Sequence, residues 1–313
     1  MNITTILFYT VYLKTIKVSC NSKTKEVNKM SEMNKTRTHK FVDTHPYLAA
    51  CLFGVILWLV AGFLSAGINF LIHLVIADYP VTTGPVGTVL GSIAALLFYQ
   101  FWFRPEFEGH MKGGDIAEGF RAAVPYLIYL AVSFVIDLFF VPEISFKLIS
   151  LNLLFTAIAA GFIEETIFRG GLLTTMLRKM NNPNRILTAA VISAAVFGVI
   201  HMTNIVSGAG VMITVMQSIN AFTTGLADAL IYMVSGNIFV TIAIHTLHDI
   251  LAFSFDTVTD SGLMTSTITW ETWLNFALCT ALGVYSIYMM RKESIQKHIM
   301  NVWNKKWNVT DKD

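Results

Sequence analysis

Residues 148–177 carry the feature that decides the fold, and they read LISLNLLFTAIAAGFIEETIFRGGLLTTML. Apolar side chains dominate this segment, which is longer than the roughly 20 residues needed to cross the hydrocarbon core of a bilayer. Three charged residues interrupt it, namely Glu164, Glu165 and Arg169. A charge at the centre of a membrane-spanning helix costs roughly 2.5–3.5 kcal/mol on insertion scales, so this cluster indicates a functional site.

The composition of the whole chain supports a membrane protein. Hydrophobic residues make up 54% of the 313 residues and charged residues only 13%. Apolar runs of about 20 residues predict eight membrane-spanning helices, which lie at residues 47–77, 84–103, 120–141, 148–177, 186–201, 211–234, 238–255 and 270–290. The predicted fold class is therefore all-α, a polytopic membrane helical bundle of about eight transmembrane helices.

Three regions of the chain differ in composition. Residues 1–45 form a polar extension, rich in Lys, Asn, Ser and Thr over residues 20–40, and we expect it to be disordered. Residues 46–292 hold the predicted spans and form the transmembrane domain, and residues 293–313 form a basic tail. The cysteines lie in separate regions and indicate neither a disulfide framework nor a metal knuckle; they are Cys20, Cys51 and Cys279.

The basic residues predict the orientation of the chain in the membrane. If the N-terminus is cytosolic, lysines and arginines occupy the inner loops and tails, and the outer loops hold only Lys147. Cytoplasmic loops carry such an excess of basic residues, so we expect a multi-pass protein of the cell membrane with both termini in the cytosol. The net charge of +2 conceals this asymmetry, which indicates a lipid bilayer as partner rather than nucleic acid.

Further ionisable residues stand in the later spans, with His201 in the fifth and His245 and Asp249 in the seventh. His245 and Asp249 are four residues apart and therefore share one helix face. Glu164 and His201 each lie about 18 residues from the middle of the turn at residues 181–184. At 1.5 Å per residue both are roughly 27 Å from that turn, so an antiparallel hairpin brings them to the same depth.

The two adjacent carboxylates are predicted to differ in role. Glu165 precedes Arg169 by four residues, the favourable order for a helical ion pair. Glu164 is rotated by about 100° from Glu165 and stays available as a free carboxylate. Asp137 and Asp228 stand alone in their spans and receive no role, while His248 is expected to pack beside the site.

Three motifs occur in order on three apolar segments, namely Glu164-Glu165-x-x-x-Arg169, Phe197-x-x-x-His201 and His245-x-x-x-Asp249. Together they resemble the CAAX-protease and bacteriocin-processing family of intramembrane glutamic endopeptidases, whose members are also described as abortive-infection proteins. The resemblance covers roughly residues 148–255. Many members carry Asn where this chain has Asp249, so the protonation state at this position matters for its role.

The resemblance implies an endopeptidase in which Glu164 and His201 hold and activate a water molecule, while His245 and Asp249 face the developing oxyanion. Glu165, Arg169 and Phe197 then support the site. A carboxylate in a low-dielectric site is a better base, and a donor at the oxyanion contributes about 3–4 kcal/mol. No metal or other cofactor is expected. The predicted partner is a peptide or protein substrate that arrives from the membrane or the cytosol.

Other classes of protein stay open at this stage. A zinc metalloprotease also uses Glu and His, but the chain contains no His-Glu-x-x-His motif. A proton-coupled transporter also places Glu, His and Asp within the membrane, although paired broken helices in inverted repeats are not evident in this sequence. A non-catalytic bacteriocin-immunity or scaffolding protein of the same fold is a third class. The sequence also leaves open whether the substrate is prenylated.

Overall fold

The computed structural model describes residues 41–42, 44–81, 84–102, 113–140, 145–180, 183–206, 208–255, 268 and 270–307. The chain divides into two units, Met1–His45 and Pro46–Asp313. In the first unit the backbone N–H of His45 donates to the carbonyl of Phe41. The predicted disorder of the N-terminal extension concerns residues that lie almost entirely outside the described part.

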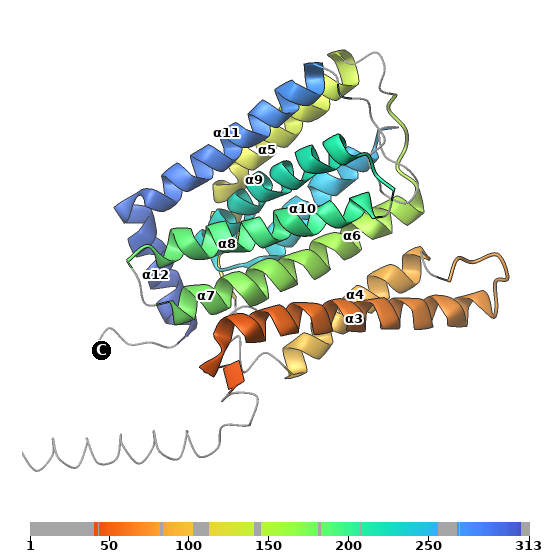
Figure 1. Cartoon of the computed structure of the whole chain (residues 1–313), viewed down its shortest axis with the longest axis horizontal. Coiled ribbons are helices and arrows are strands. Elements are labelled where there is room, and N and C mark those ends of the chain that lie inside the picture. The colour runs from red at the N-terminus through yellow and green to blue at the C-terminus, as the bar shows by residue number, and fades with distance from the viewer. Residues whose placement is uncertain are drawn as a thin grey trace, which may run out of the picture. The chain divides into compact units, whose positions relative to one another are not determined.

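Helices make up nearly all of the described part of the second unit (Figure 1), and they confirm the all-α prediction. They are α3 (Pro46–His73), α4 (Pro85–Trp102), α5 (Ile116–Phe140), α6 (Leu151–Glu165), η1 (Thr166–Leu173), α7 (Thr174–Lys179), α8 (Arg185–Ile200), η2 (His201–Ile205), α9 (Val211–Ser235), α10 (Ile238–Phe253), α11 (Trp270–Arg291) and α12 (Glu293–Lys306). Among the described residues, extended pairing is limited to one antiparallel bridge between Phe146 and Phe255.

The predicted membrane helical bundle is confirmed by the length and apolar character of its helices. Five segments are long and apolar enough to cross a membrane, namely Pro46–His73, Ile116–Phe140, Leu151–Lys179, Arg185–Ile205 and Trp270–Arg291. The apolar helices Pro85–Phe98 and Ile238–Phe253 are shorter. Large apolar side chains such as Trp58, Phe63 and Phe139 are well exposed, which fits a surface that contacts lipid. The count of eight spans stays a prediction.

Helix α9 is the most buried helix of the bundle and packs against α5, α8 and α11. Figure 1 shows α5 and α11 side by side, with α9 and α10 between this pair and α6. Two glycines allow the close approaches that shape the site. A Cβ on Gly161 of α6 would clash with the hydroxyl of Thr246 on α10, and a Cβ on Gly225 of α9 would lie 3.2 Å from Arg169.

The predicted unbroken helix over residues 148–177 differs from the structure in two ways. The helix begins at Leu151, where Ser150 caps it by accepting a hydrogen bond from the backbone N–H of Leu153. Residues Thr166–Leu173 form a π-helical stretch, a wider turn that is rare and often occurs at functional sites. The hydroxyl of Thr174 donates to the carbonyl of Arg169 across this turn at 2.8 Å.

The predicted C-terminal tail contains the amphipathic helix α12, which covers one end of α9. Its indole Trp303 is fully buried and donates from Nε1 to the carbonyl of Met233 at 3.0 Å. Ile299 is buried on the same face, whereas Glu293 and Lys297 form an exposed ion pair. Residues 308–313 lie outside the described part of the chain.

Candidate active site

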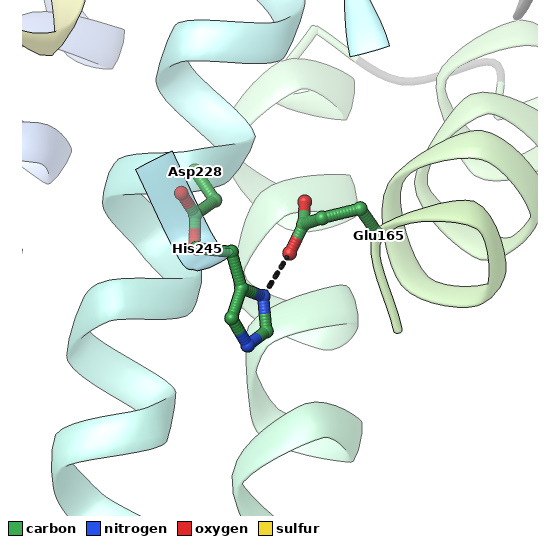
Figure 2. A group of neighbouring side chains, drawn as sticks. All are labelled: Glu165, Asp228 and His245. Carbon is green, nitrogen blue, oxygen red and sulfur yellow. Dashed lines mark hydrogen bonds and ion pairs between the residues drawn. The ribbon is translucent and has the colours of Figure 1, made fainter. Parts of the chain in front are cut away.

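Glu165, which was predicted to support the site, lies at the centre of the observed contacts, and its side chain is fully buried. Its Oε1 atom lies 2.9 Å from Nη1 of Arg169, which is the ion pair expected from their spacing. The same Oε1 accepts a hydrogen bond from Nδ1 of His245 at 2.8 Å (Figure 2). Because Nδ1–H donates to this carboxylate, the ring is held in one orientation and its Nε2 atom points toward other groups.

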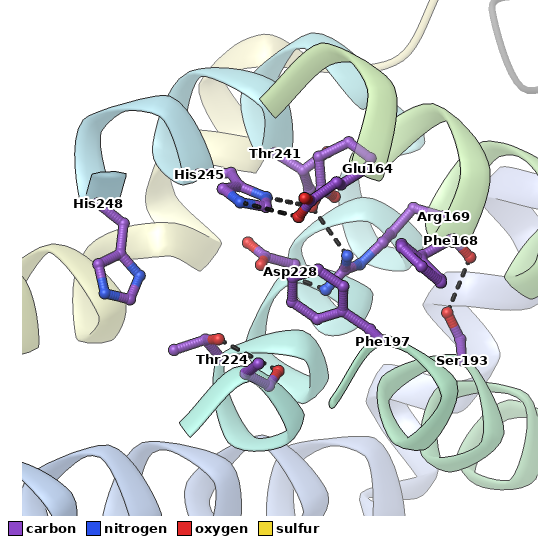
Figure 3. Close-up of polar contacts among 12 residues, drawn as sticks. Glu164, Phe168, Arg169, Ser193, Phe197, Thr224, Asp228, Thr241, His245 and His248 are labelled. Atoms are coloured by element: carbon purple, nitrogen blue, oxygen red, sulfur yellow. Dashed lines mark hydrogen bonds and ion pairs between the residues drawn. The ribbon is translucent and has the colours of Figure 1, made fainter. Parts of the chain in front are cut away.

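Asp228 joins this cluster from α9, although sequence reasoning assigned it no role. Its Oδ2 atom lies 3.4 Å from Nη2 of Arg169, and the residue is only 1% exposed. Figure 3 shows Arg169 reaching from η1 toward Asp228. The chemical signal was available in the sequence, since a guanidinium presents five donors and Glu165 alone cannot accept them all.

The Nε2 atom of His245 faces two carboxylates that are more accessible. It lies 3.6 Å from Oε2 of Glu164 and 3.7 Å from Oδ2 of Asp249. The side chains of Glu164 and Asp249 are 29% and 23% exposed, compared with 9% for His245. These separations are too long for direct hydrogen bonds but suit a bridging water molecule. The three groups can therefore act together on a small polar ligand.

Phe197 connects the two histidines of the predicted site. Its ring centroid lies 4.8 Å from that of His201 and 5.7 Å from that of His245, in edge-to-face contacts. The guanidinium of Arg169 lies over the ring of Phe197, 4.6 Å from its centroid. His201 donates from Nδ1 to the backbone carbonyl of Phe197 at 2.8 Å. This bond does not use the Nε2 atom of the ring.

The hairpin of α6–α7 and α8 sets the depth of the site. Phe168 on η1 and Phe197 on α8 pack with centroids 5.0 Å apart, and Ser193 donates from its hydroxyl to the carbonyl of Phe168 at 2.8 Å. Glu164 precedes Phe168 by one turn, and His201 follows Phe197 by one turn. Because the two helices are antiparallel, both Glu164 and His201 lie one turn farther from the hairpin turn than the Phe168–Phe197 contact. This contact therefore agrees with the equal depths estimated for Glu164 and His201.

All seven residues predicted for the site therefore belong to one contact network in the structure. Glu164, Glu165, Asp249 and Phe197 contact His245, while Arg169 contacts Glu165 and His201 contacts Phe197. Figure 3 shows His248 apart from the side chains around Arg169. Its Nδ1 atom is 2.8 Å from the hydroxyl of Tyr126 on α5.

Three buried residues could in principle hold a metal ion. Glu165, Asp228 and His245 offer ligand atoms that all lie within 4.8 Å of one another (Figure 2). The guanidinium of Arg169, however, already faces both carboxylates. A divalent cation at this point would lie beside a fixed positive charge, so the donor set suits an ion-pair network better than a metal centre.

An open pocket reaches Glu164 from the side of α3 and α4. Its volume is about 530 Å³, within the range of ligand pockets. Small and apolar side chains form most of its wall, including Trp58, Leu59, Ala66, Ala160 and Ile163. Glu164 supplies the carboxylate of this wall. An apolar ligand in the pocket would thus contact the most accessible carboxylate of the site.

One of the comparisons with known proteins found a similarity, and it covers the segment that holds this site. Residues 146–251, about a third of the chain, match a family model described as type II CAAX prenyl endopeptidase Rce1-like. The matched segment contains all three motifs of the predicted site. Curated proteins and solved structures gave no match to the chain. Residues 146–251 are therefore similar to type II CAAX prenyl endopeptidases of the Rce1-like family.

Proposed function

We propose that this protein is an intramembrane glutamic endopeptidase that hydrolyses a peptide bond in a peptide or protein tail delivered to the membrane. The observation that carries the proposal is the arrangement around His245. The Nδ1 atom of its ring is bound to Glu165, which pairs with Arg169. The Nε2 atom is turned toward the partly exposed Glu164 and Asp249. A fixed buried side and an accessible acidic side are what general acid–base chemistry in a membrane requires.

In this mechanism Glu164 removes a proton from a water molecule that His201 helps to hold. The water oxygen attacks the carbonyl carbon of the scissile bond and forms a tetrahedral oxyanion. The carbon–nitrogen bond then breaks, and protonated Glu164 returns its proton to the leaving amine. The water thus supplies the oxygen of the new carboxyl group, and no other reactant is consumed.

His245 is proposed to stabilise the oxyanion through Nε2–H. Its Nδ1–H bond to Glu165 keeps the ring in place and favours a second proton on Nε2, because a buried carboxylate partners the imidazolium. Asp249 lies on the same side, 3.7 Å from this nitrogen, and in its protonated form it donates a second hydrogen bond to the oxyanion. Arg169 acts indirectly, since its charge balances Glu165 and Asp228.

The pocket next to Glu164 supports a substrate with an apolar segment beside the scissile bond. Its walls come from α3, α4 and α6, and its rim carries the well-exposed side chains of Trp58 and Phe63. Such a rim lies at the lipid-facing surface of the bundle, so an apolar or lipid-modified tail can enter without crossing a polar barrier.

Peptide cleavage by the protein in liposomes tests the proposal. The purified chain is incubated with a set of peptides that carry a C-terminal lipid, an apolar C-terminus or neither, and the products are read by mass spectrometry. Cleavage by the wild type, lost in Glu164→Gln and kept in Glu293→Gln, supports the mechanism. Absence of cleavage in every peptide set would favour a non-catalytic immunity or scaffolding protein.

A further inference from the structure

A row of polar side chains runs between α5, α9 and α11, away from the pocket that reaches Glu164. On α11 these residues recur every four positions, and on α5 every three or four, so each set occupies one helix face. We call this row the polar seam and define it as Tyr126, Tyr129, Ser133, Asp137, Asn220, Thr223, Glu271, Asn275 and Cys279. Polar side chains inside a membrane protein cost more free energy than apolar ones, so the seam calls for an explanation.

Direct contacts link much of the seam. At the end where α5 stops and α11 begins, Asn275 donates from Nδ2 to Oδ1 of Asp137 at 2.8 Å. Tyr129 lies two turns before Asp137 on α5, and Cys279 lies one turn after Asn275 on α11. The thiol of Cys279 is 2.8 Å from the hydroxyl of Thr223. The seam therefore continues from the helix ends into the middle of the bundle.

The inner end of the seam reaches His248 on α10, one residue from the proposed active site. The rings of Tyr126 and Tyr129 lie 6.1 Å apart, and both pack edge-on against His248. The hydroxyl of Tyr126 lies 2.8 Å from Nδ1 of His248. His248 immediately precedes Asp249 on α10, whose carboxylate faces His245.

Several buried polar atoms of the seam lack a hydrogen-bond partner within the part of the chain that the structure describes. They are Oδ1 of Asn220, Oδ1 of Asn275 and Oε2 of Glu271. Buried polar atoms in folded proteins are almost always satisfied, by protein groups or by ordered water. Unpaired oxygens along the seam are the partners that a row of water molecules needs.

We propose that the polar seam binds a file of water molecules and supplies the water consumed at the active site. This inference rests on the proposed function, because each hydrolysed peptide bond takes up one water molecule. The pocket at Glu164 is mostly apolar, so a substrate segment that fills it also blocks water from that side. A separate polar entrance lets substrate and water reach the site from different groups of helices.

Cys279 is a native probe of water inside the seam, because its thiol is fully buried there. In a Cys20→Ser and Cys51→Ser background, Ag⁺ is added to the folded protein in nanodiscs. The protein is then unfolded, and the remaining free thiol is alkylated and counted by mass spectrometry. We expect Ag⁺ to protect Cys279, while the bulkier N-ethylmaleimide does not react with it in the folded state.

Position 133 provides a matched pair of variants. Both variants remove the hydroxyl of Ser133 and its hydrogen bond with Tyr129, so they differ only by the two methyl groups that valine adds. Ser133→Val fills the space with methyl groups and should abolish Ag⁺ protection of Cys279, whereas Ser133→Ala leaves room for water and should retain it. With a cleaved peptide, Ser133→Val should lower kcat several-fold at unchanged KM. Thr280→Val, which removes a hydroxyl bonded within α11, should do neither.

The outcomes separate this inference from the proposed function. Failure of Ag⁺ to reach Cys279 in the parent protein, or equal protection and turnover in Ser133→Val and Ser133→Ala, would overturn the water file. If Glu164→Gln still abolished cleavage in that case, the peptidase would stand without the seam. If no peptide is cleaved, Ag⁺ protection of Cys279 that is lost in Ser133→Val still supports a hydrated seam.

Discussion

Nδ1 of His245 lies 2.8 Å from Oε1 of Glu165, the same oxygen that faces Nη1 of Arg169 at 2.9 Å. One buried carboxylate therefore balances a guanidinium and orients an imidazole. Glu164, the adjacent residue, is turned toward the opposite nitrogen of that imidazole. Glu164 and Glu165 thus have separate roles, and substitutions at the two positions are expected to have different effects.

Glu164→Gln should reduce cleavage by roughly 10²-fold or more, because it removes the general base. Its side chain is partly exposed and far enough from His245 that little packing is lost, so thermal stability should stay near that of the wild type. Turnover of an identified peptide and a melting curve in detergent measure both effects. Residual turnover above about a tenth of the wild-type value would be incompatible with a glutamic mechanism.

Glu165→Gln should lower both stability and activity. Breaking a buried ion pair costs about 3–5 kcal/mol, and the loss here falls toward the lower end because Asp228 still faces Arg169. The amide also holds His245 less firmly than a carboxylate does. Chemical unfolding in mixed micelles and kcat on the same peptide provide the readouts. A variant that unfolds like Glu164→Gln would contradict this division of roles.

Asp228→Asn should destabilise the protein without removing a group from the accessible side of the site. A hydrogen bond to a charged group contributes about 1.5–3 kcal/mol, and the 3.4 Å separation from Arg169 places the effect near the lower value. Since Glu165 and Asp228 share Arg169, the double variant Glu165→Gln/Asp228→Asn should deviate from additivity. Simple addition of the two unfolding free energies would show that the carboxylates act independently.

Ser193→Ala should disturb the register between η1 and α8. The variant loses the hydrogen bond to the carbonyl of Phe168, which holds the level of Phe197 and His201. We expect a loss of about 0.5–1.5 kcal/mol in stability together with a lower kcat at unchanged KM, and partial recovery in Ser193→Thr. Ser218→Ala is the matched control, because its hydroxyl bonds α9 to α8 at the carbonyl of Gly198 and does not bond η1.

Chelation should leave cleavage unchanged. The acidic cluster of Glu165, Asp228 and His245 is partnered by Arg169, so activity is expected to survive treatment with EDTA or phenanthroline. Metal analysis of the purified protein accompanies the assay. Activity lost on chelation and recovered on addition of zinc would assign these three residues to a metal centre and would replace the glutamic mechanism with a metal-dependent one.

The local features of the site could be predicted from the sequence, because they depend only on the geometry of a single helix. The apolar runs indicated membrane-spanning helices, and four-residue spacing predicted the Glu165–Arg169 pair and the shared face of His245 and Asp249. Each of these contacts occurs in the structure. Equal distances from the turn of an antiparallel hairpin also predicted that Glu164 and His201 lie at the same depth, and the packing of Phe168 on Phe197, one turn from each, agrees with this.

Contacts between helices were decided only by the tertiary structure. The bond from His245 to Glu165 needs α10 to approach α6 closely, and Gly161 permits this at Thr246. Asp228 enters the cluster because Gly225 on the same helix lets Arg169 lie against α9. Spacing in one helix carries no information on which faces of different helices meet, since that depends on the packing of small and large side chains across the whole bundle.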